Sequence, residues 1–185
     1  MSEYYLMSQL PSLDGIGENM PVPITEERFT ELCNSFLGKK AQNKIIKLTL
    51  TPPPTHEKSG SALIEAWDEG ERNLRLALAK VRADKMKKSF DAQINHLPVE
   101  LTRVASTAAD MDDPLEAEKF LDRHRLEFLE SLRPMDTFSE DSVFYYGLKL
   151  KLLLRIRKFD TAAGETAYRN IYTSIMNGDR LEDIQ

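Results

Sequence analysis

The chain has 185 residues, of which 41% are hydrophobic and 30% are charged, and its formal net charge is −5. This balance is typical of a folded protein with a charged surface and excludes an intrinsically disordered chain. The negative charge argues against bulk attraction to nucleic acid or anionic lipid. The single cysteine excludes an intramolecular disulfide and a metal cluster held by several thiolates.

No targeting or membrane-spanning segment is recognisable. The first ten residues lack the basic start and the apolar run of a signal peptide. No uninterrupted apolar stretch approaches the roughly 20 residues that cross a bilayer. We therefore expect a cytoplasmic protein that does not insert directly into a membrane.

Prolines divide the N-terminal part of the chain. Residues 21–23 read Pro-Val-Pro and residues 52–54 are three prolines, and both segments predict linkers because proline cannot continue a helix. The helix predicted between them begins after Thr25 and ends before Gly38. Its apolar side chains recur with the spacing of an amphipathic helix. These side chains are Phe29, Leu32, Cys33, Phe36 and Leu37.

Two short apolar runs, residues 4–7 and 45–50, are compatible with extended structure. Neither has a partner run joined to it by turn residues, so we expect no sheet beyond two short strands. The three prolines that follow the second run indicate a boundary. We therefore divide the chain into an N-terminal helical segment with proline-rich linkers over residues 1–54 and a helical bundle over residues 55–185.

The longest predicted helix runs from about Ser61 to Phe90. Its apolar seam has alternating steps of three and four residues and is interrupted at Glu71. The seam consists of Ile64, Trp67, Leu74, Leu78 and Val81. We expect Trp67 to be buried. The acidic run at residues 68–71 is followed by arginines and predicts a solvent-exposed, ion-paired face, and the glycine within it should cost about 1 kcal/mol relative to alanine.

Two further helices are predicted before residue 134. The first begins near Pro98 and ends by Ala109. Asp113 followed by Pro114 is a strong signal for the second start, because the acid can cap the helix and proline suits its first position. This second helix should stop before Pro134.

The C-terminal part predicts two more helices. Thr137 and Glu140 form a predicted capping box that opens a helix through roughly Phe159. Apolar side chains cover most of its circumference over residues 143–156, which is typical of a helix at the centre of a bundle or at an interface. A last helix is expected over residues 162–176. The predicted fold class is therefore all-α, a helical bundle of antiparallel helix pairs.

No residue pattern assembles a recognisable catalytic, cofactor-binding or metal-binding site. Residues 15–17, Gly-Ile-Gly, are half of a dinucleotide-binding fingerprint without its strand and helix, so a turn is the better interpretation. None of the histidines, His56, His96 and His124, follows a glutamate by three residues, which removes the helical di-iron pattern. Cys33 lies on the apolar face of its predicted helix, so we expect its thiol to be buried and unreactive. We expect no enzymatic activity and no cofactor.

Basic residues gather along two of the predicted helices, those over residues 61–90 and 140–159. The second group supplies the candidate partner-binding residues, which are Lys149, Lys151, Arg155, Arg157 and Lys158. One interpretation is docking to an acidic protein surface, and the alternative is an ordinary charged face paired with neighbouring acids. Nucleic-acid binding is disfavoured because exposed aromatic residues are not interleaved with the basic ones.

The N-terminal run Tyr4-Tyr5-Leu6-Met7-Ser8-Gln9-Leu10-Pro11-Ser12-Leu13 resembles the opening motif of a bacterial family of unassigned function. Members of that family open with two tyrosines and a Leu-Pro-Ser-Leu run, and they are commonly encoded among the subunits of V/A-type ATP synthases. The proline-rich turn and the helix start in residues 21–33 continue the likeness. The N-terminal motif is the most distinctive part of the resemblance.

Later segments are similar to that family and to the helical d-type subunit in the central stalk of rotary ATPases. Residues 67–75 and 79–83 resemble the long helix of this stalk subunit, and residues 145–159 followed by Gly164 are similar to its helix pairs. The d-type subunit is built from three related helical units and is considerably longer than this chain. A shortened or divergent version of the d-type subunit, or an accessory factor, therefore stays open.

The resemblance implies a mechanical role, because the d-type subunit is a helical adaptor that couples the soluble shaft to the membrane rotor ring without catalysis. The implied partners are other V/A-type ATP synthase subunits, and the implied location is the inner face of the membrane through that complex. Two other interpretations stay open. One is a stand-alone helical protein-binding or assembly factor unrelated to the ATPase, and the other is an enzyme whose site has no recognisable motif. The sequence leaves the oligomeric state open.

Overall fold

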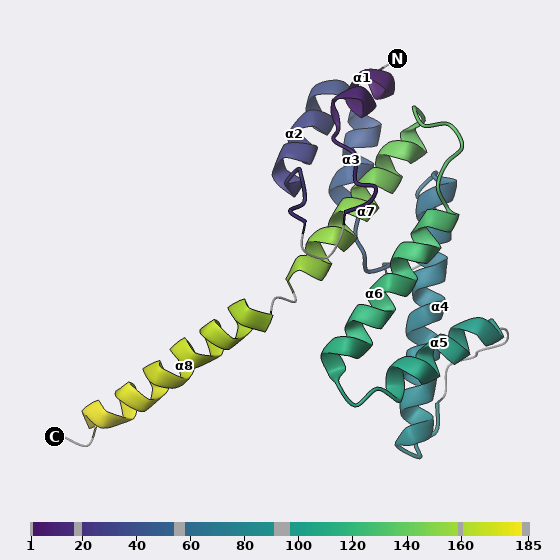
Figure 1. Ribbon diagram of the computed structural model, residues 1–185. Coiled ribbons are helices and arrows are strands. Elements are labelled where there is room, and N and C mark those ends of the chain that lie inside the picture. Colours follow the sequence, from purple (N-terminus) through teal and green to yellow (C-terminus); the bar gives the residue numbers. More distant parts are fainter. Residues whose placement is uncertain (1, 17–19, 54–57, 91–96, 159–160, 183–185) are drawn as a thin grey trace.

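Figure 1 shows the computed structural model of the protein, which describes residues 2–16, 20–53, 58–90, 97–158 and 161–182. These residues form eight α-helices and no strand, which confirms the predicted all-α class. The helices are α1 (Ser2–Gln9), α2 (Glu26–Phe36), α3 (Lys39–Lys47), α4 (Ala62–Lys85), α5 (Val99–Ala109), α6 (Pro114–Ser131), α7 (Glu140–Arg157) and α8 (Thr161–Glu182). Helices α1 to α7 form one body, and α8 runs away from it.

The three N-terminal helices pack against α7. Helix α2 begins where the sequence predicts, because the Thr25 side chain accepts a hydrogen bond from the Arg28 amide at 3.2 Å. Both runs that could be extended are instead helical, at residues 4–7 in α1 and up to Lys47 in α3. In α3 the apolar residues Ala41 and Ile45 are one turn apart and buried, so helical spacing describes that run better than strand alternation.

Helix α4 starts as predicted but ends earlier. The Ser61 side chain caps it by accepting a hydrogen bond from the Ile64 amide at 3.3 Å. Its last helical residue is Lys85, and Lys87 then adopts a left-handed φ of 53°. The Lys88 amide donates to the carbonyl of Ala83 at 2.9 Å, a closure that terminates helices. Because the closing residue is not glycine, no local sequence signal marks this end.

Helices α6 and α7 begin at side-chain caps. Asp113 caps α6 as predicted, by accepting a hydrogen bond from the Leu115 amide at 2.8 Å. The cap of α7 is Ser139, whose hydroxyl accepts from the Ser142 amide at 3.2 Å. The predicted cap, Thr137, is exposed before the helix, so that prediction was wrong by two residues.

Helix α7 lies at the centre of the body, as its apolar circumference predicts. Residues 142–150 are all buried, and α1, α2, α3, α4 and α6 pack around α7. The larger of two apolar clusters joins α7 to the N-terminal helices and to Trp67, which is 1% exposed and confirms the predicted burial. The smaller cluster joins α4, α5 and α6 through residues such as Leu74, Ala105 and Leu121.

Glu71 interrupts the apolar seam of α4 yet is only 2% exposed. The prediction that the whole acidic run forms a solvent-exposed face is therefore wrong at this residue. Arg125 of α6 donates to the Glu71 carboxylate through Nε at 3.0 Å and Nη2 at 3.2 Å. The same guanidinium donates to the buried Asp122 through Nη1 at 2.8 Å. Charge pairing of this kind makes the burial of two carboxylates tolerable.

Helix α8 continues through Gly178 to Glu182, beyond the predicted end at Met176. It packs against none of the other described helices. Figure 1 shows it leaving the C-terminal end of α7 on the side away from α4 and α5. Among the described residues, each helix is too short or too polar to cross a membrane.

Candidate functional site

Lys149 is the most buried of the candidate partner-binding residues, with 9% of its side chain exposed. Its ammonium group donates hydrogen bonds to the carboxylates of Asp14 and Glu130, both at 2.5 Å. Arg133 also donates to Asp14, at 2.9 Å. We call this network of Asp14, Glu130, Arg133 and Lys149 the N-terminal junction, because it fastens the N-terminal segment to α6 and α7.

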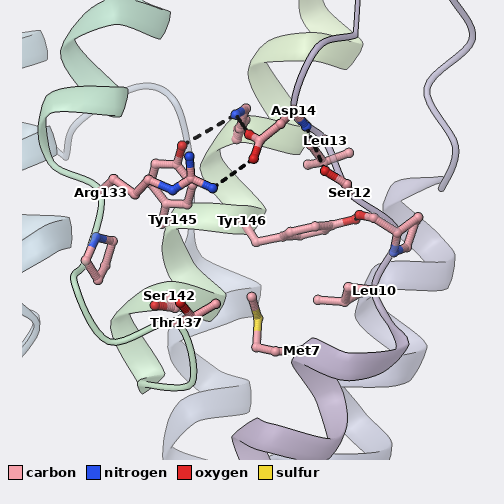
Figure 2. Close-up of a pocket in the computed structure, with 13 residues that line it drawn as sticks. Met7, Leu10, Ser12, Leu13, Asp14, Arg133, Thr137, Ser142, Tyr145 and Tyr146 are labelled. Carbon is pink, nitrogen blue, oxygen red and sulfur yellow. Dashed lines mark hydrogen bonds and ion pairs between the residues drawn. The ribbon is translucent and has the colours of Figure 1, made fainter.

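Figure 2 shows a cavity of about 200 Å³ lined in part by residues of the junction. Met7 and Leu10 face this cavity from the N-terminal segment, and the ring of Tyr146 extends across from α7. The Tyr146 hydroxyl donates a hydrogen bond to the Pro11 carbonyl at 2.8 Å, and Leu13 is buried. These contacts fix the Leu-Pro-Ser-Leu run of the N-terminal motif against α7.

Electrostatic interactions hold the junction in its charged form. Burial alone would lower the pKa of Lys149, but the hydrogen bonds to Asp14 and Glu130 outweigh it and the pKa is raised. Hydrogen bonds from Lys149 and then from Arg133 lower the pKa of Asp14. Burial, with a smaller contribution from Glu130, raises the pKa of the neighbouring Tyr145 to about 12. A protonated lysine and a protonated tyrosine are poor bases and poor nucleophiles at neutral pH. The ion pairs of the junction are therefore suited to holding the N-terminal segment against α7.

Two more candidate residues pair with acids of other helices. Lys151 forms an ion pair with Glu26 of α2. Arg155 donates through Nη2 to Glu118 of α6 at 2.9 Å, and its Nε lies 3.3 Å from the buried Asp122. The charges of Lys151 and Arg155 are therefore opposed within the chain, as the alternative interpretation of a paired charged face expects.

The last two candidate residues lie at the C-terminal end of α7. Arg157 is half-buried, and Lys158 is exposed at the C-cap. The helix therefore pairs each of Lys149, Lys151 and Arg155 with acids from other segments of the chain and leaves Lys158 facing solvent. A partner-binding role for the five basic residues stays a prediction.

An exposed aromatic group at the N-terminal end of the body was missed by the sequence reasoning. We call it the aromatic tip, formed by Tyr4 and Tyr5 of α1 with Phe138 of the loop before α7. The ring centroids of Tyr4 and Phe138 are 4.7 Å apart, and those of Tyr4 and Tyr5 are 5.7 Å apart. The exposed fractions of Tyr4, Tyr5 and Phe138 are 51%, 56% and 46%.

A sequence signal for the aromatic tip does exist. Adjacent residues on a helix point in directions about 100° apart, so on a peripheral helix with one face against the core Tyr4 and Tyr5 cannot both face that core. Leu6 takes the core position in α1 and is fully buried. A pair of adjacent tyrosines on a short helix therefore indicates that at least one of them serves the surface.

Other reactive side chains of the described residues form no site of their own. No group of three or more His, Cys, Asp and Glu side chains among them could hold a metal ion. Cys33 is fully buried, and burial raises the pKa of its thiol to about 12, which is consistent with the predicted unreactive thiol. His124 lines a hollow between α4, α5 and α6, whereas His56 and His96 lie outside the described residues. Gly15 adopts a left-handed φ of 72°, as a turn requires.

Comparison with known proteins relates the C-terminal half of the chain to a family. Residues 95–179 match a family described as a protein of unknown function, DUF2764. The matched segment includes α5, α6, α7 and most of α8, so it contains Glu130, Arg133 and Lys149 of the N-terminal junction but not the N-terminal motif. No curated protein and no solved structure matches the chain significantly.

Proposed function

We propose that the protein is a non-catalytic helical subunit or accessory protein of a V/A-type ATP synthase, an adaptor between the rotary shaft and the membrane rotor ring like the d-type stalk subunit. The resemblance of the N-terminal motif to a family encoded with such subunits supports this role. The structural observation that supports a docking role is the aromatic tip. Tyr4 and Tyr5, the first residues of the motif, lie at the surface, and the Tyr4 ring packs on Phe138.

The aromatic tip has the physical properties of a docking surface. Tyrosine and phenylalanine offer large contact areas and few rotatable bonds, so they lose little conformational entropy when a partner covers them. The tip is also held in place, because the N-terminal junction and the Tyr146–Pro11 hydrogen bond fix the segment that follows α1. A preorganised surface of this kind favours binding, because little conformational freedom is lost when a partner docks.

The alternative is a stand-alone helical protein-binding or assembly factor unrelated to the ATPase. The same aromatic tip would serve such a factor, so the surface alone does not distinguish the two roles. The identity of the proteins bound to the chain in its native host distinguishes them.

The test is affinity purification of the tagged full chain from its native host, with mass spectrometry of the bound proteins. Three forms are compared, namely the wild type, the double variant Tyr4→Ser and Tyr5→Ser, and the control Ile46→Ser. Ile46 is 68% exposed on α3 and belongs to neither the junction nor the tip. We expect V/A-type ATP synthase subunits with the wild type and the control, and roughly tenfold less with the double variant.

Two results would count against the proposal. Recovery of no ATP synthase subunit with the wild type removes the stalk role and leaves the stand-alone binding role. Equal recovery with the wild type and the double variant retains the complex but removes the aromatic tip as its interface. Circular dichroism of the three purified forms shows whether each is folded.

A further inference from the structure

Helix α8 carries an apolar stripe that nothing in the described chain covers. The stripe consists of Tyr168, Ile171, Tyr172, Ile175 and Met176, each more than half exposed. The Tyr168 and Tyr172 rings stack on each other with centroids 6.2 Å apart. Five large apolar side chains along one face of a helix form a contiguous patch of the kind that marks a protein–protein contact.

A hollow of about 410 Å³ lies between α4, α5 and α6. Its walls are largely apolar, with Ala66 and Leu74 from α4, Leu101 from α5 and Phe128 from α6. The hollow also contains the carboxylates of Glu69 and Glu100, two exposed residues without an ion pair in the described part of the chain. The lining also includes Asn73, His124 and the ion-paired Glu71 and Arg125. We call Glu69 and Glu100 the acidic rim of this largely apolar groove.

We propose that the apolar stripe of α8 from a second copy of this chain fills the hollow between α4, α5 and α6. The two surfaces match in length. The α4 wall from Ala66 to Leu74 and the stripe from Tyr168 to Met176 each span eight helical steps, about 12 Å. They also match in charge. Arg169 beside the stripe is 80% exposed and lies 3.9 Å from Glu165 of its own helix, an exposed and weak pair. It could therefore turn toward the acidic rim.

The area of contact favours a reciprocal arrangement in which each copy inserts its α8 into the other. Five half-exposed apolar side chains offer roughly 500 Å² per helix. Because the hollow exposes less surface than the stripe, one such contact would bury less than roughly 1,000 Å² counted over both surfaces, below the lower limit for a specific complex, whereas two contacts double the area. Reciprocal insertion also closes the assembly as a two-fold dimer, since a single insertion leaves one helix and one hollow open for further addition.

Other occupants account for fewer of these features. Figure 1 shows α8 running away from α4, α5 and α6, the helices that line the hollow of its own chain. A symmetric pair of α8 helices would cover both stripes but would leave the hollow empty and the acidic rim without its counterpart. Insertion of the second copy's α8 into the hollow buries both apolar surfaces and places Arg169 opposite the acidic rim.

The test is sedimentation equilibrium of the purified full chain with paired charge reversals. The wild type should form a concentration-dependent dimer, and Ile171→Glu should abolish it. Arg169→Glu alone, and Glu69→Arg with Glu100→Arg, should each raise the dissociation constant roughly tenfold, because every charge contact occurs twice in the dimer. The three reversals combined in one chain restore opposite charges across the contact and should return the dissociation constant toward that of the wild type.

The charge reversals lie on exposed side chains, so circular dichroism should show that all variants stay folded. A wild type that is monomeric at every concentration overturns the proposal. A dimer that survives Ile171→Glu also overturns it. In a third outcome, Ile171→Glu abolishes the dimer but the reversals at Glu69 and Glu100 leave its dissociation constant unchanged. That result would identify a symmetric α8 pair and overturn the hollow as the docking site.

Discussion

Gly70 shows how closely two helices of this protein approach. A Cβ atom added to it would lie 2.3 Å from the Cε1 and Cζ atoms of Phe128 on α6. The Phe128 ring in turn stacks on Trp67 with centroids 6.1 Å apart, so displacing the ring into the hollow beside it would weaken this stacking. The glycine therefore sets the distance between α4 and α6 despite its poor helix propensity.

Replacement of Gly70 by alanine should lower stability. The gain in helix propensity is about 1 kcal/mol, whereas displacement of a packed aromatic ring costs about 1–3 kcal/mol. We expect Gly70→Ala to reduce the free energy of unfolding by about 1 kcal/mol net, measured by denaturant titration. Gly164→Ala in α8 is the control, because no atom lies within 4 Å of its added Cβ. A Gly70→Ala variant as stable as the wild type would contradict the close approach.

The N-terminal junction makes stability depend on pH in a defined direction. The lowered pKa of Asp14 means that its contribution is fully present above the ordinary value of 3.8 and is lost as the pH falls through the folded value. The raised pKa of Lys149 maintains the other partner up to and beyond its ordinary 10.5. The junction should therefore stabilise the fold throughout the neutral range.

Asp14→Asn tests this dependence. The stability difference from the wild type should be constant between about pH 5 and 9 and should shrink below pH 3.8. Its size should be about 1 kcal/mol or less, because Asp14 is half exposed and solvent screens the pair. Urea titration at a series of pH values measures the difference, and a gap that widens toward acid pH would contradict the assignment.

Among the single elements, α7 starts at a cap that sequence reasoning misplaced. Ser139 accepts from the Ser142 amide at 3.2 Å and donates to the Asp136 carbonyl at 2.9 Å. Thr137 lies two residues before this cap. Because α7 is the central helix, its first turn positions both the aromatic tip and the cavity beside the N-terminal junction.

Ser139→Ala should destabilise the protein by about 1 kcal/mol, the usual cost of removing a serine N-cap. Thr137→Ala is the matched control two residues earlier and should cost less than about 0.5 kcal/mol, as exposed substitutions usually do. Thermal unfolding of both variants beside the wild type measures the two costs. The reverse ranking would restore Thr137 as the cap.

Helix starts were predictable where the signal is local. Thr25, Ser61 and Asp113 each cap the helix that follows them, because a short polar side chain and the next amides form one unit within a few residues. The end of α4 was not predictable, because Lys87 adopts a left-handed conformation usually taken by glycine. The burial of Glu71 depends on a partner 54 positions away, which no local pattern reveals.

The candidate site was less predictable than the fold for the same reason. The basic side chains of α7 were found in the sequence, but their acids come from α2, from α6 and from the segment after α1. The aromatic tip likewise combines α1 with a loop more than a hundred residues later. Only the packed structure brings these segments together.

Across the helical body, a buried charge network joins the helices that carry the two apolar clusters. Arg125 binds Glu71 of α4 and Asp122 of α6, and Arg155 of α7 pairs with the same Asp122. The exposed fractions of the Glu71 and Asp122 side chains are 2% and 1%. Because water cannot solvate these carboxylates, their protein partners have to hold them in place.

Arg125→Met should therefore be costly, because it leaves two buried carboxylates short of a partner. We expect a loss of about 3 kcal/mol or more in the free energy of unfolding, toward the range measured for broken buried ion pairs. Arg75→Met is the control, since Arg75 pairs with Glu71 from a position that is 43% exposed, and it should cost about 1 kcal/mol or less. Equal losses in the free energy of unfolding for the two variants would mean that the buried network stabilises the fold no more than the exposed ion pair does.

Docking of the aromatic tip onto a V/A-type ATP synthase is tested most directly by photo-crosslinking in the native host. A benzophenone amino acid replaces Tyr5, and the same amino acid in place of Ile46 serves as the control. We predict that the residue at position 5 crosslinks to an ATP synthase subunit, identified by mass spectrometry, and that the one at position 46 does not. Crosslinks from position 5 to unrelated proteins alone, or to none, would contradict the docking role.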